Sequence, residues 1–223
     1  MKIIARIRNG YDGKFGVPRQ SGLVEEVVSD IVFEPEYRVA EALRGIEEFS
    51  HLWLIWAFDR AEREEWSPTV RPPRLGGNKR VGVFATRSPY RPNAIGLSCV
   101  RLAAVEKGSE GTVLKVAGAD LMNGTPIYDI KPYLPYADCR PEATGGFTDR
   151  TEKRRVEVEI PSGLAEKIPE EERKALEAVL REDPRPAYQD DPERIYAFEF
   201  GGRHIEFRVE KGKLKVLEIR DLP

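Results

Sequence analysis

Short strand-like segments limit what this chain can fold into more than any other feature of its sequence. The clearest is residues 52–58, a nearly continuous apolar run that indicates a buried central strand. One helix is expected early in the chain, over residues 36–48, and its apolar face would carry Val39, Leu43 and Ile46. Many strands with one helix predict a β-rich barrel or sandwich. The other expected strands are residues 1–8, 23–33, 81–85, 96–105, 112–119 and 126–130.

A second, smaller unit is expected beyond residues 141–146, where proline and glycines interrupt the strand pattern. Residues 169–181 predict a short amphipathic helix, because acids fill its first turn and suit the positive end of the helix dipole. Strands at 195–200, 204–209 and 214–219 predict a meander. We therefore expect a β domain over residues 1–145 and a small α+β domain over residues 150–223.

Composition and motifs exclude several classes of protein. Of 223 residues, 40% are hydrophobic and 33% charged, as in soluble globular proteins, and no apolar run approaches the ~20 residues of a membrane-spanning helix. The chain has no P-loop, dinucleotide-binding, zinc-protease or nucleophile-elbow motif. With only two histidines, a histidine-based metal site is not expected. Cys99 and Cys139 make no disulfide framework, so a cytoplasmic location is expected.

A tract without acids interrupts a chain whose formal net charge is only −2. Residues 66–105 contain no Asp or Glu, although composition alone would place about seven there. Such a tract predicts a site for an anion or a phosphate backbone. The alternative is a set of surface arginines paired with acids from elsewhere. The candidates for contact with RNA phosphates are Arg71, Arg74, Lys79, Arg80 and Arg91.

Four polar segments lie at loops or strand ends and are candidates for ligand binding. They are residues 18–22, 50–52, 87–93 and 120–126. The third contains two X-Pro pairs, which favour extended backbone and make it a stiff loop. Taken singly, each segment could equally be ordinary turn chemistry or a structural ion-pair donor.

Together these segments closely resemble the TsaA-like family, also called TrmO. The resemblance rests on "KFGVPRQSGL", "EEFSHLWLIWAF", "PPRLGGNKRVGVFATRSPYRPNAIGLS", "GADLMNGTPIYDIKPY" and "DPRPAY", and covers residues 16–136 together with a C-terminal part like the small domain of bacterial members. It implies a mainly β fold in which a single-sheeted β-barrel methyltransferase domain precedes a small C-terminal α+β domain. It also implies a homodimer that uses S-adenosylmethionine and methylates the exocyclic amine of threonylcarbamoyladenosine beside the tRNA anticodon.

The resemblance also assigns a cofactor role to residues of the four polar segments. S-adenosylmethionine presents an adenine edge, a ribose, a carboxylate and a sulfonium, and needs hydrogen-bonding groups together with apolar cover. Arg87 is suited to a carboxylate, and Leu97, Leu121 and Met122 to the adenine, with Asp120 at a polar end. The cofactor-binding residues implied are Pro18, Arg19, Gln20, His51, Leu52, Arg87, Leu97, Asp120, Leu121, Met122 and Asn123.

Asp129, Lys131 and Tyr133 are the candidates for the substrate side of the reaction. Methyl transfer is an in-line displacement that mainly requires nucleophile and methyl group to be held about 3 Å apart, so no covalent nucleophile is needed. Tyr133 could instead simply pack a turn. Two other functions stay open at this point: a regulator that binds S-adenosylmethionine without a methyl acceptor, and a methyltransferase acting on a small molecule or a protein.

Overall fold

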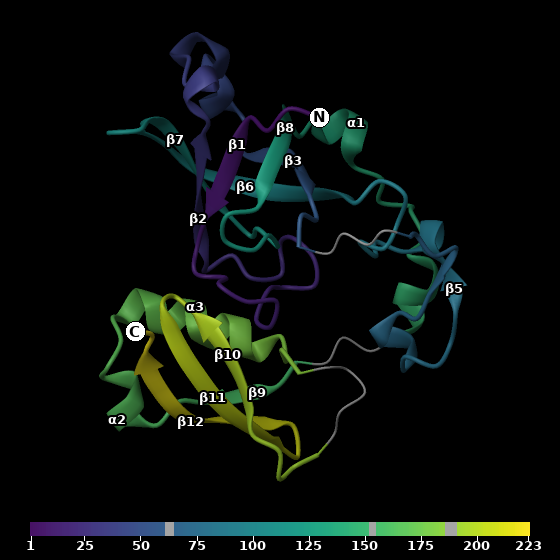
Figure 1. The fold of residues 1–223 in the computed structure, drawn as a ribbon, viewed down its shortest axis with the longest axis vertical. Helices are drawn as coiled ribbons and strands as arrows, with labels where there is room; N and C mark the ends of the chain where they lie inside the picture. The colour runs from purple at the N-terminus through teal and green to yellow at the C-terminus, as the bar shows by residue number, and fades with distance from the viewer. Residues whose placement is uncertain (61–64, 152–154, 186–190) are drawn as a thin grey trace.

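Six antiparallel strands form a closed barrel in a computed structural model of the chain (Figure 1), which describes residues 1–223 except 61–64, 152–154 and 186–190. Their order is β1-β2-β7-β6-β3-β8, and β8 pairs back with β1. The expected mainly β architecture is confirmed. The strands are β1 (Ala5–Arg8), β2 (Val28–Phe33), β3 (His51–Ala57), β6 (Ile95–Gly108), β7 (Gly111–Ala117) and β8 (Pro126–Pro132).

The apolar run of β3 places side chains on both the inner and the outer face of the barrel sheet. Leu52, Leu54 and Trp56 point into the core, with 0%, 0% and 5% of their surface exposed. Trp53 and Ile55 alternate with them on the outer face and are half-buried. The run is continuous because the outer face of this strand is apolar as well.

The prediction of a helix over residues 36–48 is wrong. Three 3₁₀ helices stand there instead: η1 (Pro35–Tyr37), η2 (Ala40–Leu43) and η3 (Ile46–Glu48). Val39 has extended backbone (φ −104°, ψ 113°) and is 48% exposed, so it does not continue a buried face. Gly45 then adopts the left-handed conformation (φ 86°), which interrupts any regular helix before η3.

A small arm lies between β3 and β6 in the sequence and stands to one side of the barrel (Figure 1). It contains β4 (Thr69–Val70) paired with β5 (Val81–Gly82), and the 3₁₀ helices η4 (Pro73–Leu75) and η5 (Val83–Ala85). The expected strand over residues 81–85 is therefore too long. Val83 donates its N–H to Pro68 O at 3.0 Å, and Thr86 Oγ1 caps the turn by donating to Val83 O at 2.8 Å.

The C-terminal part is a four-stranded sheet packed against a helix. Its order is β10-β11-β12-β9, with β9 parallel to β12. Helix α3 (Glu170–Arg181) buries Leu176, Val179 and Leu180 against this sheet. The strands are β9 (Glu157–Glu159), β10 (Tyr196–Phe200), β11 (Arg203–Glu210) and β12 (Lys213–Asp221), and the remaining short elements are α1 (Pro135–Asp138), η6 (Gly146–Arg150) and α2 (Ser162–Ala165).

The loop between β1 and β2 joins the two parts of the molecule. Its residues Tyr11, Val24 and Val27 are buried in the same apolar cluster as α3 and the C-terminal sheet. Gly16 has a φ of 91°, and a Cβ there would lie 2.6 Å from the Phe198 ring. This loop is therefore held by the C-terminal core as well as by the barrel.

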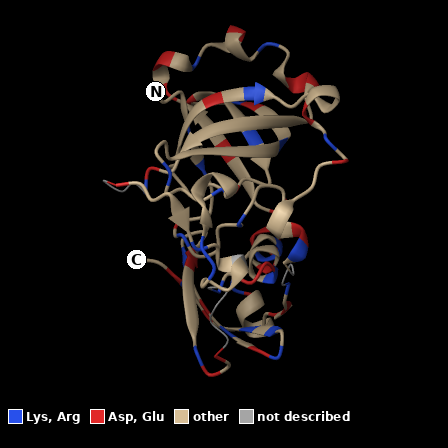
Figure 2. Ribbon diagram, turned by 90° about the vertical axis from the view of Figure 1, so that its right-hand side faces the viewer, with Lys and Arg blue, Asp and Glu red and all other residues tan. Residues whose placement is uncertain are grey.

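Positively and negatively charged residues alternate along the ribbon of both the barrel and the C-terminal sheet (Figure 2). Within the described residues, no helix is both long and apolar enough to cross a membrane.

Candidate functional site

Gln20, Arg87 and Asp120 come together from three distant segments of the chain. Gln20 belongs to the loop between β1 and β2, Arg87 to the proline-containing loop after η5, and Asp120 to the segment that follows β7. Nη1 of Arg87 donates to Oε1 of Gln20 at 2.6 Å. Burial, the largest effect, raises the pKa of Asp120, and the positive charge of the nearby Arg87 guanidinium offsets only part of that rise.

Asp120 is the most buried charged group of this cluster. It accepts hydrogen bonds from the Ser98 hydroxyl and from the backbone N–H of Ser21. Burial nevertheless raises the pKa of the Asp120 carboxyl above its usual range, since desolvation outweighs these bonds. Ser98 is itself held by Trp56, whose Nε1–H donates to Ser98 Oγ at 2.9 Å. A fixed acceptor thus lies beside an exposed cation, Arg87.

The neighbouring residues Pro18 and Arg19 are positioned by the C-terminal part. Pro18 is buried. Nη2 of Arg19 donates to the carbonyl oxygen of Arg185 at 3.2 Å and lies 3.5 Å from that of Asp183. Asp183 and Arg185 form a two-bond ion pair, at 2.8 and 2.9 Å, with side chains only 8% and 6% exposed. The loop that carries the cofactor candidates is thus hydrogen-bonded to a C-terminal turn that holds a buried ion pair.

Asn123 anchors the other side of the same loop. Its Oδ1 accepts from the backbone N–H of Asn9 at 3.3 Å, and its Nδ2 donates to Oδ1 of Asp12 at 3.3 Å. Met122 is half-buried, whereas the side chains of Leu121 and Leu52 are fully buried in the barrel core. Leu52 and Leu121 could therefore meet a ligand only through their backbone groups.

His51 and Tyr133 form a second cluster rather than joining the first. Their ring centroids lie 6.2 Å apart, and the backbone N–H of Tyr133 donates to His51 O at 3.0 Å. His51 begins β3, whereas Ser98 pairs in register with Leu54, three residues further along. That separation corresponds to about 10 Å of strand. Partial desolvation, together with nearby Cys139, raises the pKa of the Tyr133 phenol.

Asp129 and Lys131 lie on β8, beside the outer face of β3. Lys131 Nζ is 3.1 Å from Asp129 Oδ2, and both side chains are largely exposed. In register they face Ile55 and Trp53 of β3. Leu97 of β6 pairs with Ile55 from the other side and is 54% exposed. The substrate candidates and Leu97 therefore belong to neighbouring positions on one outer surface.

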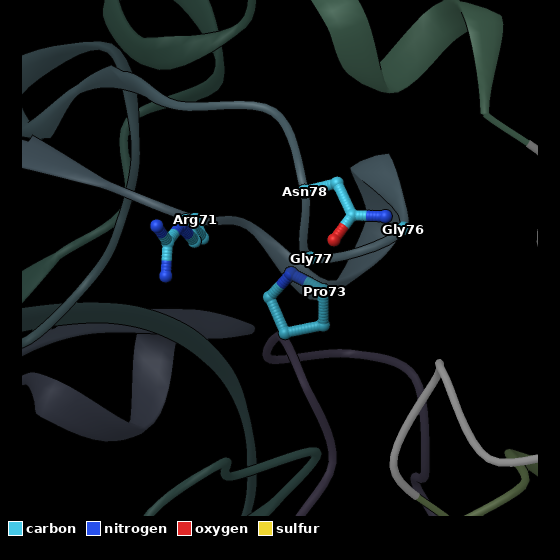
Figure 3. Close-up of a pocket in the computed structure, with 5 residues that line it drawn as sticks. All are labelled: Arg71, Pro73, Gly76, Gly77 and Asn78. Atoms are coloured by element: carbon cyan, nitrogen blue, oxygen red, sulfur yellow. The ribbon is translucent and has the colours of Figure 1, made fainter.

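The cations of the arm have no acidic partners within the described part of the chain. Arg80 donates to Thr69 Oγ1 at 3.2 Å, and Arg91 donates to the carbonyl of Thr86 at 3.1 Å. Arg71 lines an open hollow of about 630 Å³ with Pro73 and Asn78, all from one segment (Figure 3). Lys79 is exposed. The side chain of Arg74 lies outside the described residues. Among the described residues, which do not include Glu62 and Glu64, Arg71, Lys79, Arg80 and Arg91 form no ion pair with an acid.

Two features of the site were not among the expectations from sequence. Ser98 and Trp56 support Asp120, and the only trace of this in the sequence is a serine at an inward position of an apolar strand. Asp183 and Arg185 support Arg19 through a contact between residues more than 160 positions apart. Among the described residues, no group of three His, Cys, Asp or Glu side chains could hold a metal ion.

Comparison with known proteins identifies the chain. The model of the tRNA-methyltransferase O N-terminal domain matches residues 6–139, and that of the TrmO C-terminal domain matches residues 153–222. A tRNA (adenine(37)-N6)-methyltransferase of Escherichia coli is 39% identical over 97% of this chain and 95% of its own length.

Two proteins of Pseudomonas aeruginosa extend this result. A putative S-adenosylmethionine-dependent methyltransferase, RcsF, is 38% identical over 97% of this chain and 95% of its own length. A crystal structure of TrmO superposes with a TM-score of 0.79 at 32% identity and covers 98% of this chain and 95% of the solved one. With both domain models matched along nearly its whole length, the chain belongs to the tRNA-methyltransferase O family.

Proposed function

We propose that this protein is an S-adenosylmethionine-dependent tRNA methyltransferase that methylates N6 of threonylcarbamoyladenosine at position 37, beside the anticodon. The observation that carries the proposal is the meeting of Gln20, Arg87 and Asp120 in a molecule whose arm carries cations with no acidic partner among the described residues. One cluster can hold a small charged cofactor, and the other can hold RNA. Both lie in a chain that the two tRNA-methyltransferase O domain models match over residues 6–139 and 153–222.

The cluster has the groups that S-adenosylmethionine requires. The cofactor supplies a methyl group already activated by its sulfonium. The Arg87 guanidinium is hydrogen-bonded to the neutral amide of Gln20 and lies near Asp120, and its remaining N–H groups can meet the cofactor carboxylate. The Asp120 carboxylate can accept from a hydroxyl or amine, or stabilise the positive sulfonium. Pro18, Arg19, Gln20, Met122, Leu97 and Asn123 remain our candidates for contact, with backbone groups of Leu52 and Leu121; His51 would contribute from the far end of β3.

The substrate side fits an adenine amine that is already part of a urea. The amine of plain adenosine is a poor nucleophile, because its lone pair is delocalised into the ring. The threonylcarbamoyl group makes the N–H more acidic, so a modest acceptor such as Asp129 can assist its removal. Lys131 can hold the threonine carboxylate and so orient the nitrogen, with Tyr133 shaping the pocket.

The outer face of β3 and β6 supports a homodimer as part of this proposal. Ile95 and Leu97 expose 37% and 54% of their surface there, beside Trp53 and Ile55. A self-complementary apolar face of this kind suits a two-fold contact. A second copy would also cover Leu97, which a cofactor alone would leave partly in water.

We further propose that residues 1–145 form a single-sheeted β-barrel catalytic domain and residues 150–223 a small α+β domain. Support comes from the closed strand order of the first and the helix-covered sheet of the second. We also propose a cytoplasmic location, because the proposed substrate is tRNA.

The decisive experiment is nucleoside mass spectrometry of tRNA incubated with the protein and labelled cofactor. Methylation of tRNA that carries threonylcarbamoyladenosine, but not of the same transcript without it, is expected. Equal methylation of both would reject the urea mechanism. Absence of any methyl transfer, with cofactor bound, would favour a regulator. Label that survives RNase treatment in a protein or small molecule would identify another substrate.

A further inference from the structure

Two exposed aromatic rings lie side by side in the arm. Trp66 and Phe84 have ring centroids 6.1 Å apart and planes inclined by 30°, which is a stacked arrangement. Phe84 is 71% exposed and Trp66 is 50% exposed. The guanidinium of Arg91 lies 5.9 Å from the centroid of the Phe84 ring. These three side chains therefore make one flat, cationic and largely uncovered surface, called here the aromatic shelf.

Packing within the arm does not explain the shelf. In η5 the buried side chain is Val83, the residue before Phe84, whereas Phe84 points outward. Leaving a phenyl ring mostly in water forgoes much of the stabilisation that its burial would give. Large exposed aromatic surfaces on a folded protein usually mark a binding site.

The charge around the shelf indicates the class of partner. The arm's cations Arg71, Lys79, Arg80 and Arg91 have no ion pairs with acids among the described residues. A two-fold contact between copies centred here would bring these like charges together, which opposes association. A nucleic acid supplies both missing components, because its phosphates are anionic and its bases have planar faces.

We propose that Trp66 and Phe84 stack against an unpaired base of the RNA substrate while the surrounding cations contact its backbone. This inference rests on the proposed function and adds to it a recognition element outside the cofactor cluster. Duplex RNA offers no free base face, so the occupant is a base of a single-stranded loop. Arg91 positions the Phe84 ring and adds a cation–π contribution, and the base itself needs no sequence-specific hydrogen bond.

The test measures binding of a tRNA anticodon stem-loop RNA by fluorescence anisotropy over a range of salt concentrations. Stacking on an aromatic side chain is worth about 1–3 kcal/mol per base, so Phe84→Leu should weaken binding about 5- to 150-fold. Phe84→Tyr, which keeps the ring, should bind like the wild type. Trp66→Ala should weaken binding in the same range. Because Phe84 is mostly exposed, none of these changes should lower the melting temperature appreciably.

Salt dependence separates stacking from charge. Phe84→Leu should leave the slope of log affinity against log salt unchanged, whereas Arg80→Ala should reduce it by about 0.7–0.9. The matched control is Tyr136→Ala, which removes an 85% exposed ring outside the arm and should bind like the wild type. In parallel, 2-aminopurine placed at each unpaired loop position should be quenched by the wild-type protein at one position and not by Phe84→Leu.

Each outcome decides the proposal. Wild-type affinity and quenching for Phe84→Leu, in a protein that still methylates tRNA, would overturn the shelf and leave the proposed function intact. Conversion of the protein to monomers by Phe84→Leu, seen in sedimentation, would assign the shelf to a second copy and also overturn it. Failure of the wild type to bind or methylate any tRNA would reject the proposed function and the shelf together.

Discussion

Ser98→Ala tests whether the barrel core and the candidate cofactor cluster are one hydrogen-bonded unit. Ser98 is fully buried, accepts from Trp56 Nε1 and donates to Asp120. Its removal leaves a buried indole N–H without an acceptor, which costs about 1–3 kcal/mol, and takes a hydrogen bond from a carboxylate, worth about 1.5–3 kcal/mol. Because relaxation and water entry offset part of both, we expect a loss of about 2–4 kcal/mol in the free energy of unfolding at pH 7.

The same substitution should make stability depend more steeply on pH. Burial raises the pKa of Asp120 in the folded protein, so the folded state binds its proton more tightly than the unfolded chain does. The stability that this proton contributes is fully present below the ordinary carboxyl pKa of about 3.9 and is lost as pH rises through the folded pKa. Removing the Ser98 donor raises that pKa further. The defect of Ser98→Ala should therefore be smaller near pH 4 than at pH 7.

Urea unfolding monitored by circular dichroism at several pH values provides the measurement, with Asp120→Asn as the control background. In that background the effect of Ser98→Ala should be the same at every pH, because the titrating group is gone. A defect in the Asp120 protein that does not change with pH would refute the proposed coupling. A free energy of unfolding unaltered at pH 7 would refute the whole hydrogen-bonded chain from Trp56 to Asp120.

Three further perturbations probe the site and its support. Arg87→Ala should weaken binding of S-adenosylmethionine by about 1.5–3 kcal/mol in calorimetry, and unchanged binding would remove Arg87 from the cofactor contacts. Arg185→Gln leaves Asp183 as an unpaired buried charge and should lower the free energy of unfolding by about 3–5 kcal/mol, with a wild-type melting temperature as the contrary result. Gly16→Ala places a Cβ 2.6 Å from Phe198 at a positive φ and should cost at least about 1 kcal/mol; equal stability would mean that the loop shifts freely.

Local patterns predicted most strands of the fold, because alternation and apolar runs reflect burial directly. The run at residues 52–58 became β3, offset by one residue. The pattern at residues 36–48 failed, since Val39 and Gly45 have backbone conformations that helical periodicity does not reveal. Strand β9 was not among the expected strands, although residues 156–160 alternate between apolar and charged side chains; only three of them pair in the sheet.

The candidate site was predictable only as separate segments. Motifs picked out Gln20, Arg87 and Asp120 individually, but their meeting depends on the barrel register that sets Leu54 opposite Ser98. The same register keeps His51 apart from them, which no local pattern could indicate. Contacts such as Arg19 with the turn at Asp183 depend on the packing of the two parts, and that packing depends on side-chain volumes far apart in the chain.

These contacts also explain why the C-terminal part matters to a site whose chemical groups lie mainly elsewhere. The loop carrying Pro18, Arg19 and Gln20 buries Tyr11, Val24 and Val27 in the C-terminal cluster. Its backbone is held there as well, since Gly201 N donates to Gly10 O at 2.9 Å and Gly202 N donates to Asp12 Oδ2 at 3.1 Å. Without that cluster the loop would expose these apolar side chains and lose the anchor of Arg19, so Gln20 would no longer be fixed against Arg87. The C-terminal part thus supports the loop that carries the proposed cofactor residues Pro18, Arg19 and Gln20.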